Sequence, residues 1–236
     1  MYNYLQSEFN KFHEKIKLHD RADNAILREK REMLEKELRE YFAKKAKEEG
    51  TAKITFSVGN QGSYSMGTGI RPLDNEDYDI DVMILLNISK DDHKPVAVKK
   101  WVYQALDRSN RTVEDKKPCV RVQYHKNGKK LYHVDLAIYA NENSDGKTYL
   151  SWGKFKSAPA DKKWEISEPE ALKDKINKRF KNSDDQQQMK RVIRYLKRWK
   201  DIKFKNTGHG KPTGIALTAL AYNLFTPQID RDTFSS

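Results

Sequence analysis

The sequence contains a single cysteine, Cys119. One thiol cannot form an internal disulfide or a thiolate-rich zinc site, and this scarcity favours a reducing, cytoplasmic compartment. Long apolar runs are also missing, because none approaches the roughly 18 residues that a helix needs to cross a bilayer. The charged N-terminal segment lacks the apolar stretch of a secretory signal. The sequence therefore predicts a cytoplasmic protein without membrane spans.

Apolar residues are few, at 37% of the 236 residues, against 34% charged residues. Nine Phe, 12 Tyr and 4 Trp can still furnish a core, which argues against wholesale disorder. The length fits one large domain or two small ones. Lysine and arginine exceed the acidic residues by 12. This excess favours anionic partners such as nucleotides, nucleic acid or an acidic protein, but does not choose among them.

Residues 1–50 are predicted to form a helical scaffold. Apolar side chains recur there at helical spacing, among them Leu34 and Leu38, and Gly50 stands where a helix C-cap is expected. The remaining positions of this stretch are mostly Glu, Lys and Arg at spacings that suit a solvated helix face.

Residues 51–165 are predicted to form a small mixed sheet with at least one helix. Alternating apolar residues predict strands from Lys53, over 78–86, and around 120–124 and 131–139. Asn127-Gly128 predicts a hairpin between the last two strands. An apolar face follows Pro95, which suits the first turn of a helix.

Residues 166–236 are predicted to form a helical lobe. Ser183 begins a capping-box pattern, and the helix after it carries an apolar stripe flanked by many lysines and arginines. The glycines around His209 break that helix. Residues 215–225 are almost wholly apolar, which predicts a buried helix. The sequence contains no internal repeat and no low-complexity linker. Because a mixed sheet is predicted between two helical regions, the chain as a whole is predicted to be α+β.

Three aspartates are predicted to converge on this sheet. Asp79 and Asp81 lie two apart on one strand and so share a face. Asp135 has the same setting on a second strand, with Val134 and Leu136 on the opposite face. Neighbouring carboxylates repel one another unless a cation lies between them. Oxygen ligands of this kind suit Mg²⁺ or Mn²⁺, and a pair of such ions is a common device for phosphoryl transfer.

A turn rich in small residues precedes the acid pair. Gly62 and Ser63 follow a strand and open a predicted helix. Backbone N–H groups in such a turn can approach an anion, and the Ser63 hydroxyl can donate to a phosphate oxygen. The turn and the acids together predict a site for a triphosphate and its metal ions.

The motifs Gly62-Ser63, Asp79-Ile80-Asp81 and Val134-Asp135-Leu136 resemble those of polymerase-β-like nucleotidyltransferases. Among these the chain is most similar to the bacterial CD-NTases, relatives of cyclic GMP-AMP synthase and oligoadenylate synthase, which make cyclic oligonucleotide signals in anti-phage (CBASS-type) defence. The resemblance implies that Asp79, Asp81 and Asp135 hold two Mg²⁺ or Mn²⁺ ions. It also implies that Gly62 and Ser63 hold the donor triphosphate.

The resemblance extends to three later positions. Lys197 resembles the family lysine that reaches the donor phosphates, and Thr213 takes the place of a family serine with a similar role. Ser167 lies in a segment similar to one that lines the acceptor-base pocket. For Lys197 a solvated helix face, and for Thr213 a simple helix N-cap, are the competing interpretations. The family also implies further helix beyond the position of Phe225.

Three functions are compatible with these residues. The first is a template-independent transferase that joins NTPs into a cyclic second messenger, with separate regulatory or effector proteins as its partners. The second keeps this chemistry but acts on an RNA or protein acceptor, with the basic helix 190–200 holding RNA. The third is a catalytically inactive nucleic-acid-binding module on the same fold, against which the presence of all three aspartates argues.

Overall fold

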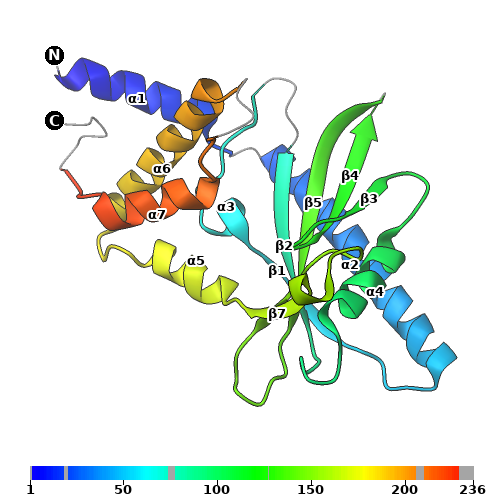
Figure 1. The fold of residues 1–236 in the computed structure, drawn as a ribbon. Helices are drawn as coiled ribbons and strands as arrows, with labels where there is room; N and C mark the ends of the chain where they lie inside the picture. Colours follow the sequence, from blue (N-terminus) through cyan, green and yellow to red (C-terminus); the bar gives the residue numbers. More distant parts are fainter. Residues whose placement is uncertain (1, 19–20, 74–77, 127, 206–209, 229–236) are drawn as a thin grey trace. The chain divides into compact units, whose positions relative to one another are not determined.

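The computed structural model describes residues 2–18, 21–73, 78–126, 128–205 and 210–228. Two helices begin the chain, most of the strands follow in its middle part, and three helices come after the last strand (Figure 1), which confirms the α+β class. The elements are α1 (Tyr2–Ile16), α2 (Arg21–Glu49), β1 (Phe56–Asn60), α3 (Gly62–Ser65), β2 (Tyr78–Leu86), α4 (Pro95–Leu106), β3 (Thr112–Asp115), β4 (Val120–Lys126), β5 (Lys129–Ala140), β6 (Tyr149–Trp152), the 3₁₀ turn η1 (Pro159–Asp161), β7 (Lys163–Ile166), α5 (Pro169–Asn177), α6 (Ser183–Lys203) and α7 (Gly214–Leu224).

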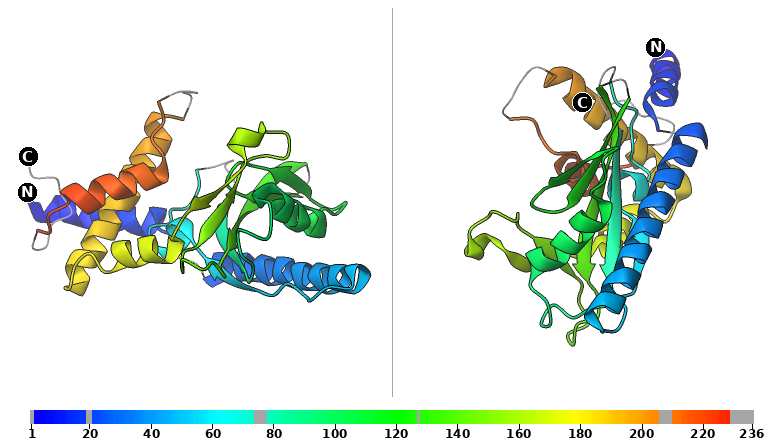
Figure 2. Two further views of the ribbon diagram at one scale, coloured as in Figure 1. Left: turned by 60° about the horizontal axis from the view of Figure 1, so that its bottom comes forward. Right: turned by 90° about the vertical axis from the view of Figure 1, so that its right-hand side faces the viewer.

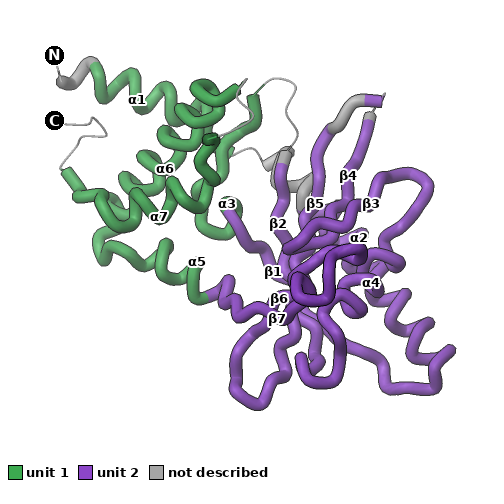
Figure 3. The backbone as a smooth tube through the Cα atoms, in the orientation of Figure 1, with its two compact units in different colours: residues 1–19, 63–75, 171–236 green, residues 20–62, 76–170 purple. Residues whose placement is uncertain are grey.

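These elements form two compact units, coloured separately in Figure 3. Unit 1 contains residues 1–19, 63–75 and 171–236, and unit 2 contains residues 20–62 and 76–170. Each unit therefore draws on separate stretches of the chain. The three domains expected from the sequence, 1–50, 51–165 and 166–236, stay a prediction.

Unit 2 is built on a sheet with the strand order β1-β2-β5-β4-β3, in which β6 also pairs with β5, and β7 pairs with β6. Only β2 and β5 in that central order run parallel, and their neighbours pair antiparallel. One face of the sheet packs on α2 and α4, and Figure 2 shows α2 running along it. The fully buried residues of the core on this face include Leu38, Phe42, Ile84, Val98, Val102, Val134 and Ile138.

Unit 1 is a helical unit in which α6 packs against α1 and α7. Met189 and Ile193 of α6 and Ala221 of α7 share one apolar cluster with Met66. Val192 and Tyr195, on another side of α6, pack on Ile16 of α1. Because α6 has apolar neighbours on several sides, three of its basic residues, Arg194, Lys197 and Arg198, are buried as well.

Three helical predictions need correction. The N-terminal helix is not continuous over 1–50, because Lys17 leaves it to form a β-bridge with Ile70. The cap of α6 is Asn182, whose side chain accepts a 2.7 Å hydrogen bond from the Asp184 amide, so Ser183 is already helical. Helix α7 is not buried as a whole, since Leu224 is 72% exposed. An 11-residue helix that packs on α6 through one stripe leaves its other apolar side chains outside.

Other predictions are confirmed with small changes. The strand at 78–86 has the predicted bounds, and the predicted helix has Pro95 in its first turn, as expected. The first strand begins at Phe56 rather than at Lys53. Gly50 has the positive φ, 64°, of a helix C-cap. Gly128 has φ 74°, whereas Asn127 of the predicted turn and the predicted helix break near His209 lie outside the described residues.

Candidate active site

The predicted acidic residues lie on neighbouring parallel strands of unit 2. In the register of β2 and β5, Asp81 pairs with Asp135 and Asp79 pairs with His133. Their apolar neighbours Ile80 and Val134 belong to the core on the other face. The side chains of a strand alternate between faces, so both pairs lie on the face opposite that core, as predicted.

The structure brings together a slightly different trio from the predicted one. Asp79, His133 and Asp135 each offer a ligand atom, and these atoms all lie within 4.8 Å of one another. His133 is 8% exposed, and its Nε2 atom lies 3.0 Å from Oδ1 of Asp79. Two carboxylates with one imidazole form a donor set that Mn²⁺ accepts, while Mg²⁺ prefers the carboxylate oxygens. The residues therefore fit a divalent metal site.

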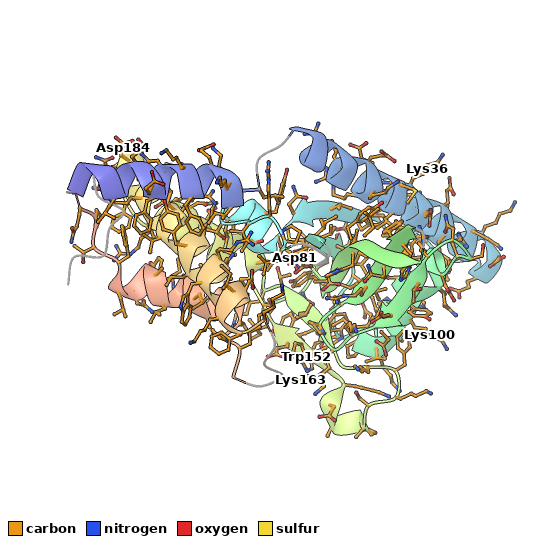
Figure 4. All side chains as sticks on the ribbon, turned by 90° about the horizontal axis from the view of Figure 1, so that it is seen from above. Lys36, Asp81, Lys100, Trp152, Lys163 and Asp184 are labelled. Atoms are coloured by element: carbon orange, nitrogen blue, oxygen red, sulfur yellow. The ribbon has the colours of Figure 1, made fainter. Side chains whose placement is uncertain are left out.

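Asp81 approaches the turn at Gly62 instead (Asp81 is labelled in Figure 4). A Cβ placed on Gly62 would fall 1.8 Å from Oδ2 of Asp81, far inside any normal contact. Gly62 also has a positive φ of 64°, which favours glycine. The amide of Gln61 donates a 3.0 Å hydrogen bond to the carbonyl of Asp81. The predicted phosphate turn thus begins in contact with one of the predicted metal ligands.

Sequence reasoning missed Arg121 as part of this site. Its Nε and Nη2 atoms each donate a 2.7 Å hydrogen bond, to Oδ1 and Oδ2 of Asp135 respectively. This ion pair raises the pKa of Arg121, and the charge of Asp79 acts in the same direction. The alternation Val120-Arg121-Val122 indicates that Arg121 lies on the face opposite the core, but it does not identify the partner.

Nearby Cys119 is buried. Burial and the negative charge of Asp135 together raise the pKa of its thiol. The thiol is therefore neutral, because burial and Asp135 outweigh the positive charges of Arg121 and Lys99, which act in the opposite direction.

Ser167, the predicted base-pocket residue, also belongs to unit 2. Its amide donates to the carbonyl of Thr148 at 3.1 Å, and its hydroxyl interacts with that of Tyr139. Tyr139 donates a 3.0 Å hydrogen bond to Oε1 of Gln61. Burial raises the pKa of Tyr139 to about 12, so the phenol stays protonated. Tyr139 therefore connects Ser167 with the residue before Gly62.

The other three predicted site residues belong to unit 1. Ser63 is half-buried in α3, and its carbonyl accepts a 2.9 Å hydrogen bond from the Thr68 amide. Lys197 is buried, not on a solvated helix face, and its Nζ donates to the carbonyl and the hydroxyl of Thr68, both at 3.1 Å. Thr213 caps α7 by accepting a 3.2 Å hydrogen bond from the Ala216 amide. The cap interpretation of Thr213 is thus confirmed, while its role toward phosphate stays a prediction.

Two arginines of α6 hold the same segment as Lys197. Arg194 donates a 2.6 Å hydrogen bond to the carbonyl of Gly67, and Arg198 donates to the carbonyl of Arg71. Both guanidinium groups are buried. Burial lowers the pKa of Arg194 and also that of Lys190, whose side chain lies beside Gly67. Several cations of α6 therefore surround the segment that follows Ser63.

Sequence comparison identifies the family of the sheet region. Residues 57–139 match the family described as "Cyclic GMP-AMP synthase DncV-like, nucleotidyltransferase domain". This segment is a DncV-like nucleotidyltransferase domain. The match contains Gly62, Asp79, Asp81 and Asp135. It confirms the resemblance to CD-NTases of the polymerase-β-like superfamily.

Individual relatives agree with this assignment. The chain is 30% identical over 193 residues to a cyclic GMP-AMP synthase from Escherichia albertii, covering 78% of this chain and 40% of that protein. It is 24% identical over 193 residues to a c-di-GMP synthase from Roseivirga ehrenbergii, covering 74% of this chain and 50% of that protein. The chain thus spans half or less of the length of these curated relatives.

Solved structures show the same fold. The apo form of Vibrio cholerae DncV has a TM-score of 0.71 and 19% identity, over 92% of this chain and 70% of that one. The GTP-bound form of the same protein has a TM-score of 0.71 and 18% identity, over the same shares of the two chains.

Within the part of this chain that the structure describes, none of the helices is long and apolar enough to cross a membrane.

Proposed function

We propose that this chain is a template-independent nucleotidyltransferase that joins NTPs into a cyclic oligonucleotide. The observation that carries the proposal is the convergence of Asp79, His133 and Asp135 within 4.8 Å, on a face where Asp81 also contacts the turn at Gly62. The curated relatives bear the names of synthases that make cyclic dinucleotides. Family, carboxylates and phosphate turn therefore support the same chemistry.

In this proposal a ribose hydroxyl attacks the α-phosphate of a bound NTP, and pyrophosphate leaves. Asp79, Asp81 and Asp135 would hold two Mg²⁺ or Mn²⁺ ions, which neutralise charge on the phosphates and lower the pKa of the attacking hydroxyl. Gly62 and Ser63 would hold the donor triphosphate through backbone N–H groups and the Ser63 hydroxyl. A second round of the same reaction on the linear product would close the ring.

Lys197, Thr213 and Ser167 would complete the nucleotide site. Lys197, whose Nζ donates to the carbonyl and the hydroxyl of Thr68, would contribute its positive charge to the binding of the donor phosphates. The Thr213 hydroxyl, at the N-terminus of α7, lies where a helix dipole favours anions. Ser167, in contact with Tyr139, would face the acceptor base.

The double variant Asp79→Ala/Asp81→Ala tests this proposal. Purified protein is incubated with all four NTPs and Mg²⁺ or Mn²⁺, pyrophosphate release is measured, and products are identified by mass spectrometry. We expect phosphatase-resistant small products from the unaltered chain and none from the variant, with unchanged circular dichroism. Undiminished pyrophosphate release by the variant would refute the assignment.

The same reactions separate the proposal from transfer to another acceptor. Products that appear only with added RNA or protein would favour the second function. Helix α6 argues against a role in RNA binding. The basic residues of its 190–200 stretch are buried or half-buried in the structure, namely Lys190, Arg191, Arg194, Lys197, Arg198 and Lys200. Salt-sensitive nucleic-acid binding without turnover would instead favour the inactive module.

We further propose that the product is a second messenger in CBASS-type anti-phage signalling, read by separate effector proteins in the cytoplasm. Only the family supports this step. The test is a phage challenge of cells that carry the gene and its neighbouring genes, with and without the Asp79→Ala/Asp81→Ala change. Equal phage yields in the two strains would exclude the role.

A further inference from the structure

Both oxygens of the Asp135 carboxylate accept hydrogen bonds from the Arg121 side chain. Nε of Arg121 donates to Oδ1 and Nη2 donates to Oδ2, each at 2.7 Å. This fork matches both oxygens of the carboxylate, and such charge-assisted bidentate pairs are among the strongest hydrogen-bonded pairs in proteins. The negative charge of Asp135 is therefore already paired with the positive charge of Arg121.

The surroundings make this pair more than a surface ion pair. The Asp135 side chain is 14% exposed and that of Arg121 is 28% exposed. Partial burial removes much of the water that screens exposed pairs. The negative charge of Asp79 also favours the charged form of Arg121. Arg121 thus offsets the repulsion among carboxylates at paired positions of β2 and β5.

A divalent ion and the Arg121 guanidinium would compete for the carboxylate oxygens of Asp135. Asp135 is one of the three residues whose ligand atoms lie within 4.8 Å of one another. An ion among these atoms would bring two positive charges to the carboxylate whose two oxygens already accept from Arg121. Like charges at such short range repel strongly where solvent is partly excluded.

We infer that Arg121 is the built-in competitor of the metal ion. It neutralises Asp135 while no metal is bound, and a divalent ion that binds Asp79 and Asp135 takes a carboxylate oxygen from it. Arg121 is then a positioning residue that sets the metal affinity of the site. This inference rests on the proposed function, because it requires Asp135 to be a metal ligand.

The first experiment measures Mn²⁺ binding by the decrease of the free-ion electron paramagnetic resonance signal. We compare the unaltered chain, Arg121→Gln and a control, Arg39→Gln, which removes the same charge from an exposed pair with Glu35 on α2. We expect a Kd about tenfold lower for Arg121→Gln, because an opposing charge is gone. The control should change Kd by less than about twofold, because its charge is screened.

An unchanged or weaker Mn²⁺ affinity in Arg121→Gln overturns the inference. If the Asp79→Ala/Asp81→Ala variant binds Mn²⁺ as well as the unaltered chain does, the proposed function fails instead. The same titration therefore tests the two claims separately, the inference with Arg121→Gln and the proposed function with Asp79→Ala/Asp81→Ala.

A second experiment keeps the native arginine, because breaking a partly buried ion pair could destabilise the fold. In ¹⁵N-labelled protein, Arg121→Lys identifies the Nε–H resonance of Arg121 by its absence. We expect titration with Mg²⁺ to shift this resonance and to speed its exchange with water as the hydrogen bond to Asp135 is lost. A resonance that stays unchanged at saturating Mg²⁺ overturns the inference.

Discussion

Gly62 leaves room for the carboxylate of Asp81. A methyl group on Gly62 would lie 1.8 Å from Oδ2 of Asp81, and the residue has a φ of 64°. Two separate requirements, a left-handed backbone and the absence of a side chain, therefore meet at one position beside the proposed metal ligands.

Gly62→Ala should abolish nucleotide transfer because the added methyl displaces either Asp81 or the turn. Gly50→Ala is a matched control, since Gly50 also has a φ of 64° but nothing lies within 4 Å of an added methyl. Both variants should lose about 1 kcal/mol of unfolding free energy from backbone strain. Thermal denaturation and pyrophosphate release measure the two effects. An active Gly62→Ala enzyme would contradict the proposed site.

His133 should be needed for metal affinity as well as for packing. Its Nε2 atom lies 3.0 Å from Oδ1 of Asp79. Partners that orient or share a metal ligand contribute about 10–100-fold to metal affinity, so we expect His133→Ala to weaken Mn²⁺ binding by that order. His133→Gln should recover part of the loss, because its amide can donate a hydrogen bond. Affinity unchanged in the alanine variant would remove His133 from the site.

Thr213 allows the cap to be separated from phosphate binding. Thr213→Ala removes the hydrogen bond to the Ala216 amide and should cost about 1 kcal/mol of stability. Thr213→Asn keeps a capping oxygen but no hydroxyl, so we expect native stability with a raised KM for NTPs. Thr213→Ser should keep both properties. If Thr213→Asn has the native KM, the residue is a cap alone.

Stability of the protein should fall in mild acid because of His13. Burial and the nearby Arg194 lower the pKa of His13 from 6.5 to about 4, and the two side chains are 3.0 Å apart. Between these two pH values the His13 side chain binds a proton in the unfolded chain but not in the folded chain. The contribution of His13 to stability is therefore fully present above pH 6.5 and is lost as the pH falls towards 4. The loss should be about 1–2 kcal/mol after allowance for solvent screening.

Thermal melts from pH 7 to pH 4 check this prediction with His13→Gln, which should flatten the pH dependence. Exposed His125 on β4 provides the control, and His125→Gln should leave the native profile in place. Identical profiles for all three proteins would contradict the assignment to His13.

The position of the acids could be predicted because it depends only on alternation along single strands. Asp79 and Asp81 flank Ile80, and Asp135 lies between two apolar residues, so burial of one face places the carboxylates on the other. The parallel pairing that sets Asp81 beside Asp135 was not predicted, because no local pattern specifies which strands become neighbours or in which direction they pair.

Arg121 could not be assigned to Asp135 for a physical reason. Lys126 pairs with Lys129 across the hairpin, and that register alone would set Val120 opposite Asp135. The register shifts at Tyr124 and His125, so that Arg121 lies opposite Asp135 instead. A single extra residue in one strand changes which residues of the two strands lie opposite each other. The residue types around this bulge do not predict it.

The exposure of α7 had a different cause. Its apolar composition correctly predicted a helix, but burial depends on how many neighbours surround it. In the described residues α7 packs mainly on α6, so Leu220 and Leu224 are left exposed.

The side-by-side arrangement of β2 and β5 has a consequence for the order of events during folding. Asp81 and Asp135 are separated in the chain by α4, β3 and β4, so a long loop must close before the two carboxylates meet. A chain that has formed only its local hairpins would therefore lack the proposed metal site. Binding of Mn²⁺ during refolding would thus report when β2 and β5 pair.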